Sequence, residues 1–101
     1  MNRISLFITS DDPFFIRGLS TIFSSEEDFN VLGGFSLAES TSKAVTKQPD
    51  AILLDLSGNT SSSEQFVSHI KEKCPFTLII ALVEEEHHEG LPALLDKGID
   101  G

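Results

Sequence analysis

The sequence has little cysteine, few basic residues and no long apolar run, and each absence argues against a class of protein. Its one cysteine, Cys74, excludes an internal disulfide bond and fits a reducing cytoplasm; its place beside Pro75 indicates a helix end rather than a nucleophile. Only 7 basic residues accompany 16 acids, giving a net charge of −9 without a basic stripe, which argues against direct binding to nucleic-acid phosphates. No run of about eighteen apolar residues occurs and no signal-peptide core follows Met1, so we expect a soluble, cytoplasmic protein without a membrane span.

The order of the apolar patterns predicts an α/β fold. A chain of 101 residues is one small domain, and we take residues 1–101 as that domain. Apolar, β-favouring runs at 4–9, 29–35, 51–56 and 77–83 predict strands. Helical spacing predicts helices over about 13–25, between Ser36 and Pro49, between the polar loop 59–63 and Pro75, and at about 91–98. Right-handed crossovers then give a doubly wound parallel sheet with helices on both faces, and a fifth strand, due after 98–101, is missing.

The first predicted helix has an aromatic face that should lie on the sheet. Its apolar residues at helical spacing are Phe15, Leu19, Ile22 and Phe23. Without a fifth strand and helix, we expect an exposed patch near Phe15 and Leu19, and unpaired backbone groups along the strand at 77–83. Exposed surfaces of this kind predict a homodimer.

Acids stand at the carboxyl ends of two predicted strands. Asp11 and Asp12 follow the first strand and Asp55 ends the third, and open α/β sheets bind ligands in the crevice beyond these strand ends. Clustered carboxylates repel one another unless a cation neutralises them, and Mg²⁺ takes oxygen ligands of this kind. Asp55 would then be a nucleophile toward phosphorus. The alternative interpretation of the pattern is that Asp55 only caps the loop after its strand.

With these patterns in place, the chain resembles the receiver domains of response regulators, most of all those of NarL/LuxR (FixJ-type) transcription regulators. The matching pieces follow the family's order and spacing at 4–13, 17–19, 31–33, 49–56, 74–75 and 98–101. The resemblance implies a flavodoxin-like sheet of order 2-1-3-4-5, here 2-1-3-4, with Asp55 phosphorylated by a sensor histidine kinase. It implies Mg²⁺ held by Asp11, Asp12, Asp55 and the backbone carbonyl of Ser57. It also implies a two-component signalling domain rather than an enzyme, reaching DNA only through a separate output domain.

Several positions depart from the pattern of that family. Without a gap, Ser10 and Asp11 take the positions of the family's strand-one acid pair, whereas a one-residue shift would restore the pair as Asp11 and Asp12. Asn59 replaces a proline that shapes the loop after the phosphoacceptor. Val83 replaces the hydroxyl residue that ends strand four and bonds the phosphoryl group, and the lysine that ends strand five is absent.

These departures leave two hypotheses for the function. The retained Asp55 favours a competent, Mg²⁺-dependent phosphoacceptor, whereas the losses favour a degenerate pseudo-receiver that acts by constitutive protein contact, which we expect. A flavin-binding domain would need a hydroxyl- and glycine-rich loop where residues 10–13 present negative charge. A haloacid-dehalogenase-type phosphatase would need an aspartate at Ser57. His87 and His88 stand in an acidic stretch that we interpret as a solvated loop rather than a metal site.

Overall fold

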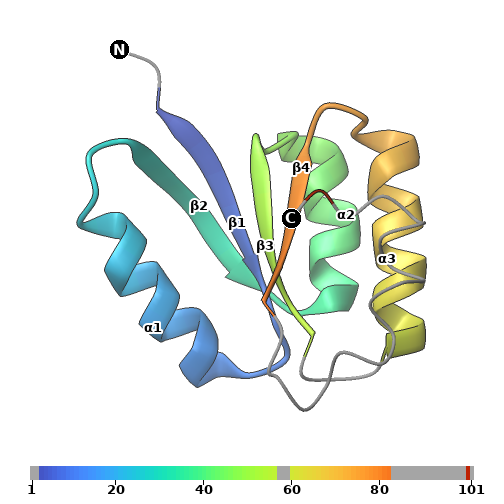
Figure 1. Cartoon of the computed structure of the whole chain (residues 1–101), viewed down its shortest axis with the longest axis horizontal. Helices are drawn as coiled ribbons and strands as arrows, with labels where there is room; N and C mark the ends of the chain where they lie inside the picture. The colour runs from blue at the N-terminus through green and yellow to red at the C-terminus, as the bar shows by residue number, and fades with distance from the viewer. Residues whose placement is uncertain (1–2, 57–59, 83–99, 101) are drawn as a thin grey trace.

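The computed structural model, which describes residues 3–56, 60–82 and 100, contains a four-stranded sheet with helices on both faces (Figure 1). Its elements are β1 (Ile4–Thr9), α1 (Pro13–Ser24), β2 (Phe29–Phe35), α2 (Leu37–Lys47), β3 (Ala51–Asp55), α3 (Thr60–Lys73) and β4 (Leu78–Leu82). All strand pairs are parallel, and the order across the sheet is β2-β1-β3-β4. The predicted α/β class, doubly wound parallel sheet and 2-1-3-4 order are therefore confirmed. The helix predicted at 91–98 and the acidic loop at 84–89 lie outside the described residues.

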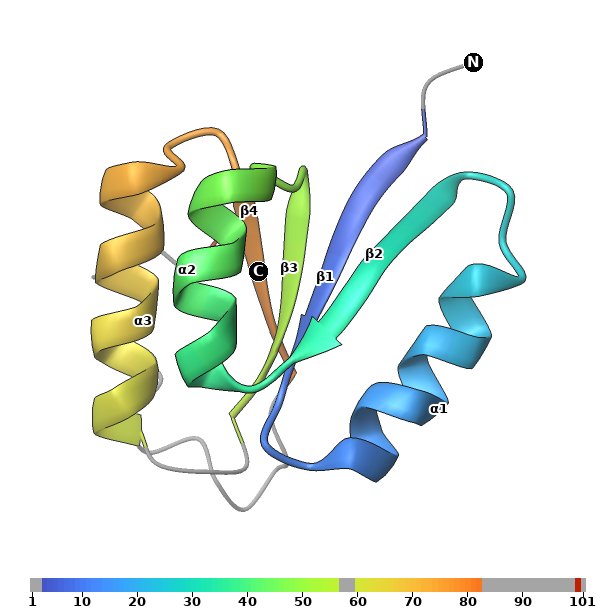
Figure 2. The ribbon, with the colours of Figure 1, turned by 180° about the vertical axis from the view of Figure 1, so that it is seen from behind.

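Helix α1 lies on one face of the sheet, and helices α2 and α3 cover the other (Figure 2). Successive residues of a strand point to opposite faces, so Phe7 packs toward α2 and α3 whereas Leu6 and Ile8 pack toward α1. The same alternation in β3 places Leu54 on the α2–α3 side and Leu53 on the α1 side. The two central strands are thus buried on both faces, which explains their nearly continuous apolar sequences.

Helices α1 and α2 begin where a polar side chain satisfies an N–H group of the first turn. The Asp12 carboxylate accepts a hydrogen bond from Phe14 N at 2.9 Å, with a proline between the two residues at the start of α1. The Ser36 hydroxyl accepts a hydrogen bond from Glu39 N at 3.3 Å and caps α2, so the helix predicted between Ser36 and Pro49 begins directly after Ser36.

Helix α3 begins earlier than the sequence pattern predicted. It starts at Thr60, within a serine-rich stretch that was predicted as a loop, so that prediction is wrong. Serine and threonine favour helices weakly, but Ser63 is buried, and burial in the fold outweighs weak local propensity. None of the helices in residues 3–56 and 60–82 has both the length and the apolar character needed to cross a membrane.

Helix α1 packs through a face that is rotated from the predicted one. The side chains that contact the sheet core are Phe15, Ile16, Leu19 and Phe23. Ile22 is 58% exposed, so its predicted place in this face is wrong. Phe15 and Leu19 are half-buried, so the patch expected near them is exposed only in part. The large apolar side chains that α1 exposes are instead Ile22 and Phe14, which is 81% exposed.

Strand β2 passes close beneath α1 at a glycine. A Cβ atom placed on Gly34 would lie 2.0 Å from Ile16 Cγ2, well inside the distance at which two carbons repel. Gly33 precedes it where the register between β1 and β2 shifts. The missing side chain at Gly34 therefore sets how closely α1 approaches the sheet.

The amino ends of β1 and β3 are joined by a reciprocal pair of polar residues. The Asp50 carboxylate accepts hydrogen bonds from Ser5 N at 2.8 Å and from Ser5 Oγ at 3.0 Å, and Asp50 N donates to Ser5 Oγ at 2.8 Å. The Pro49-Asp50 piece of the family resemblance thus has a structural role at the sheet edge opposite Asp55.

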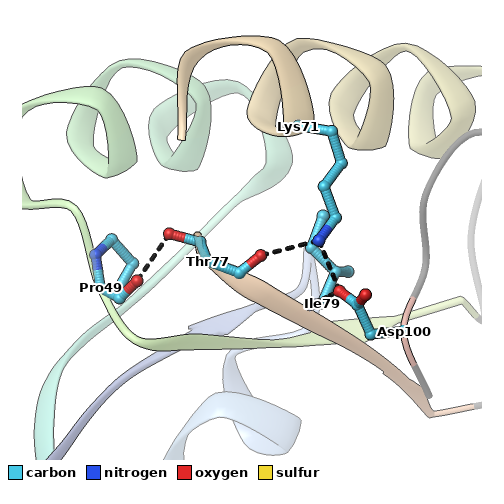
Figure 3. A network of polar contacts seen from close by, with 5 residues as sticks. All are labelled: Pro49, Lys71, Thr77, Ile79 and Asp100. Carbon is cyan, nitrogen blue, oxygen red and sulfur yellow. Dashed lines mark hydrogen bonds and ion pairs between the residues drawn. The ribbon is translucent and has the colours of Figure 1, made fainter. Parts of the chain in front are cut away.

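The outer edge of β4 is bonded near its start by Asp100 (Figure 3). Asp100 N donates to Ile79 O at 2.8 Å, and Ile79 N donates to Asp100 Oδ2 at 3.0 Å. Lys71 Nζ donates both to Thr77 O at 2.9 Å and to Asp100 Oδ2, and Thr77 Oγ1 donates to Pro49 O at 2.6 Å. The expectation of unpaired backbone groups along this strand is therefore wrong at Ile79.

Cys74 directly follows the last residue of α3 and is buried. Burial raises the pKa of the Cys74 thiol, although the hydrogen bond from Gln48 Nε2 at 3.4 Å opposes that effect in part. A thiol of raised pKa stays protonated near neutral pH and is a poor nucleophile. This agrees with the structural role predicted for Cys74.

Candidate functional site

The carboxyl ends of β1 and β3 lie side by side, because the two strands are parallel neighbours. Thr9 and Leu54 are partners in register, so the next residues, Ser10 and Asp55, emerge together at this edge. Ser10 Oγ donates a hydrogen bond to Asp55 Oδ2 at 2.7 Å. The half-buried carboxylate predicted as the phosphoacceptor is therefore in contact with a hydroxyl group. This contact agrees with the ungapped register, in which Ser10 takes the first position of the acid pair.

Ser10 is fixed in place by backbone groups on both sides. Its side chain is buried, and its N–H donates to Phe35 O at 3.0 Å, which ties the end of β1 to the end of β2. Its Oγ also accepts a hydrogen bond from Asp12 N at 3.0 Å. A hydroxyl has one proton, and here that proton is donated to the Asp55 carboxylate.

The two acids of the β1–α1 turn contact two different helices. Asp12 caps α1 as described above, and Asp11 Oδ1 accepts a hydrogen bond from Leu37 N, the first residue of α2, at 3.4 Å. Both helix N-termini carry partial positive charge, which stabilises a nearby carboxylate. The charges of both acids are thus offset by helix N–H groups of the protein itself.

A pair of hydroxyl groups joins β1 to α2 beside this edge. Thr9 Oγ1 and Ser40 Oγ lie 2.8 Å apart and share a buried hydrogen bond between β1 and α2. On the other side of β3, Leu56 N donates to Leu82 O at 3.1 Å, so the pairing with β4 continues past the carboxylate. Asp55 therefore sits on a backbone that is held by both neighbouring strands.

The four residues predicted to hold Mg²⁺ differ in what they contact. Asp11 and Asp55 present carboxylates, Asp12 is used in the cap of α1, and Ser57 lies outside the described residues. Within residues 3–56, 60–82 and 100, no three side chains of His, Cys, Asp or Glu are gathered as metal ligands. Mg²⁺ commonly takes one or two carboxylates and keeps several waters, so the carboxylates of Asp11 and Asp55 are donors of the right chemical kind.

The other residues singled out in the sequence fall outside the described part of the chain. These are Asn59, Val83, His87 and His88. The hydrogen bond from Ser10 to Asp55 was not predicted from the sequence. The ungapped alignment could have indicated it, because it places Ser10 at an acid position of the family, beside the phosphoacceptor. The cap made by Asp12 could have been found from its position directly before Pro13.

The comparisons with known proteins agree with this geometry. No protein-family model matches the chain. It is 30% identical over 92 residues to the response regulator protein VraR of Staphylococcus epidermidis, a match that covers 89% of this chain and 44% of VraR. The RcsB response regulator of Salmonella typhimurium superposes with a TM-score of 0.83 at 25% identity, over 100% of this chain and 50% of that chain.

The signal receiver domain of NarL from Mycobacterium tuberculosis shares the fold, with a TM-score of 0.79 at 19% identity over 98% of this chain and 81% of that chain. The chain spans less than half the length of VraR, so the likeness is to one part of that regulator. Sheet order, the carboxylate at the end of β3 and these likenesses point the same way. The chain is a response-regulator receiver domain, and VraR and RcsB are among the regulators that it resembles.

Proposed function

We propose that residues 1–101 form the receiver domain of a LuxR-type transcriptional regulator and act mainly as a pseudo-receiver, by constitutive protein contact. Asp55 is the phosphoacceptor position in this proposal, but the site is degenerate and accepts phosphate slowly. The observation that carries the proposal is that each acid of this edge within the described residues already has a partner in the protein. Asp55 accepts from Ser10, Asp11 from α2 and Asp12 from α1.

This arrangement lowers the need for a cation and also the catalytic power of the edge. Phosphoryl transfer depends almost entirely on positioning and on stabilising the negative charge that the phosphoryl group brings. Ser10 supplies a neutral hydroxyl where the family pattern places a second carboxylate, so a divalent cation has one charged ligand fewer. Mg²⁺, when bound, would offset the charge of an incoming phosphoryl group, and Asp11 and Asp55 would hold it.

The second candidate is a fully competent receiver controlled by a sensor histidine kinase. The position of Asp55 favours it, because the carboxylate ends β3 beside the end of β1, at the edge where open α/β sheets bind ligands. Either function places the protein in a two-component pathway in the cytoplasm, with DNA reached through a separate output domain and with a homodimer as the assembled form. RcsB, whose receiver fold this chain shares, has been solved bound to a promoter.

Intact-mass measurement with acetyl phosphate separates the two candidates. We expect a slow gain of one phosphoryl group that requires Mg²⁺ and disappears in Asp55→Asn. The matched control is Asp28→Asn, which removes an exposed acid just before β2, at the opposite edge of the sheet, and should leave the gain unchanged.

The rate is judged against the isolated RcsB receiver domain treated in parallel. A gain as fast as in RcsB that disappears in Asp55→Asn would establish the competent receiver instead. A gain that persists in Asp55→Asn would show that phosphate goes to another residue, and the site assignment would fail.

A further inference from the structure

We propose that Ser10 is a positioning residue for Asp55: its hydroxyl holds one oxygen of the carboxylate and so limits the rate at which Asp55 accepts a phosphoryl group. This inference rests on the proposed function, in which Asp55 is the acceptor. It concerns a residue that stands where related domains have an acid, and it assigns that residue an effect of its own rather than the loss of a ligand alone.

A short chain of hydrogen bonds fixes the hydroxyl. Asp12 N donates to Ser10 Oγ at 3.0 Å, and Ser10 Oγ donates to Asp55 Oδ2 at 2.7 Å. The Ser10 backbone is held by Phe35 O at 3.0 Å, and its side chain is 3% exposed, so water has little access to compete for the proton. The donor therefore stays directed at the carboxylate, and the carboxylate stays in the rotamer that meets it.

The contact works against the chemistry expected of Asp55. In transfer from acetyl phosphate, a carboxylate oxygen forms a bond to phosphorus while the bond between phosphorus and acetate breaks, and acetate leaves as the anion. An oxygen that accepts a hydrogen bond of this kind has its negative charge stabilised in the resting state. Attack through that oxygen loses this stabilisation, and attack through the other oxygen must occur from a rotamer that Ser10 has already set. Either way, the Ser10 hydroxyl stabilises the resting carboxylate relative to the transition state.

The strands offer a closely matched control at their other end. Ser5 on β1 donates its hydroxyl to the Asp50 carboxylate at 3.0 Å, and the two partners are separated by 45 residues, as are Ser10 and Asp55. Ser5→Ala therefore removes the same kind of bond between the same two strands, far from Asp55. It should lower thermal stability without altering phosphoryl gain.

We expect Ser10→Ala to accept phosphate from acetyl phosphate roughly tenfold faster than the wild type at saturating Mg²⁺. The reason is that removing a hydrogen bond to a charged group lowers the barrier by a free energy that corresponds to a rate change of about this size. Ser10→Thr keeps the hydroxyl and should restore the wild-type rate. Circular dichroism and thermal melting of each variant show whether it is folded.

Two readouts do not depend on phosphorylation. In amide NMR spectra, the Asp12 N–H signal should shift in Ser10→Ala and stay near its wild-type position in Ser10→Thr, since its acceptor is the Ser10 oxygen. In Ser10→Asp, two carboxylates meet at this edge, so added Mg²⁺ should raise the melting temperature more than it does in the wild type, by preferential binding to the folded state.

The outcomes separate this inference from the proposed function. The proposed function is decided by the absolute rate in the wild type and by Asp55→Asn, whereas the role of Ser10 is decided by the ratio of Ser10→Ala to wild type. A folded Ser10→Ala variant that gains phosphate no faster than the wild type, or gains none, overturns the inference. So does an equal acceleration in Ser5→Ala, which would mean that loosening the strands, rather than removing the Ser10 hydroxyl from Asp55, raises the rate.

Discussion

Two glycine-to-alanine substitutions should change stability in opposite directions, although the chemical change is the same. Gly18 lies inside α1 on an exposed turn, and a Cβ atom added there would meet nothing within 4 Å. Glycine within a helix costs about 1 kcal/mol relative to alanine, mostly through the freedom it has in the unfolded chain. Gly18→Ala should therefore stabilise the domain by about 0.5–1 kcal/mol, and 1 kcal/mol corresponds to a melting-temperature shift of roughly 4–8 °C for a domain of this size.

Gly34→Ala should destabilise the domain, because its new Cβ would lie 2.0 Å from Ile16 Cγ2, 3.2 Å from Ile16 Cβ and 3.4 Å from Ile16 Cγ1. The clash involves a methyl group close to the α1 backbone, so it is relieved only by moving α1 or forcing Ile16 from its rotamer. Overpacking of this kind costs about 1–3 kcal/mol. In an Ile16→Ala background the clashing methyl is gone, so the two substitutions should be non-additive by roughly 0.5–3 kcal/mol.

Urea and thermal unfolding, followed by circular dichroism at several protein concentrations, measure both effects. A destabilising Gly18→Ala that becomes worse at higher concentration would refute the open surface around Gly18 and place α1 in an interface between copies. A neutral Gly34→Ala would refute the close approach of α1 to β2. Shifts of opposite sign that do not change with protein concentration would leave α1 docked on the sheet as seen, with its outer face free.

Three further predictions concern the core, a cap and the β4 edge. Leu54→Ala removes a fully buried side chain between β3 and the α2–α3 layer and should cost about 2–5 kcal/mol in urea unfolding. Asp12→Ala removes the α1 cap and should cost about 1 kcal/mol in the same assay. Burial acts to raise the pKa of Asp100, but hydrogen bonds from Lys71 and Ile79 and the Lys71 charge hold it below its usual value overall. The contact between Asp100 and Lys71 therefore adds stability above the unfolded-state pKa of Asp100, near 4, and this stability is lost as pH falls through the lower folded-state pKa. Lys71→Met should remove this pH dependence from the free energy of unfolding. The change should be less than about 1 kcal/mol, because the pair is partly exposed.

The strands of this fold could be predicted from sequence because burial on both faces writes a simple pattern. β1 and β3 are nearly unbroken apolar runs, and only parallel central strands require that. The orientation of α1 could not be predicted to the same degree. Ile16 and Ile22 are both apolar and both compatible with one helical stripe, and the choice between them depends on where Gly34 lets the helix approach the sheet. The pattern of α1 alone does not contain this information, because Gly34 lies in β2.

The site was predictable in its location but not in its contacts. Acids at parallel strand ends indicate a shared edge, and Asp55 does lie at that edge. The sequence does not reveal the protein groups that offset the charges of these acids, because those partners are set by the tertiary fold. Leu37 N reaches Asp11 from another helix, and Ser10 meets Asp55 across 45 residues of chain. The cap of α1 by Asp12 is the exception, since it is a local contact and the Asp12-Pro13 sequence predicts a helix start.

Strand β1 comes first in the chain but lies in the middle of the sheet, so its two edges are filled in turn by later segments. The β1–α1–β2 unit closes a shorter loop than the pairing of β1 with β3, and shorter loops lose less entropy on closing. We therefore expect β2 and α1 to dock before β3 during folding. Until β3 pairs with β1, Ser10 cannot donate its hydrogen bond to the Asp55 carboxylate. The bond between them marks the moment at which the topology is complete, and its formation in refolding experiments would time the last long-range closure of the sheet.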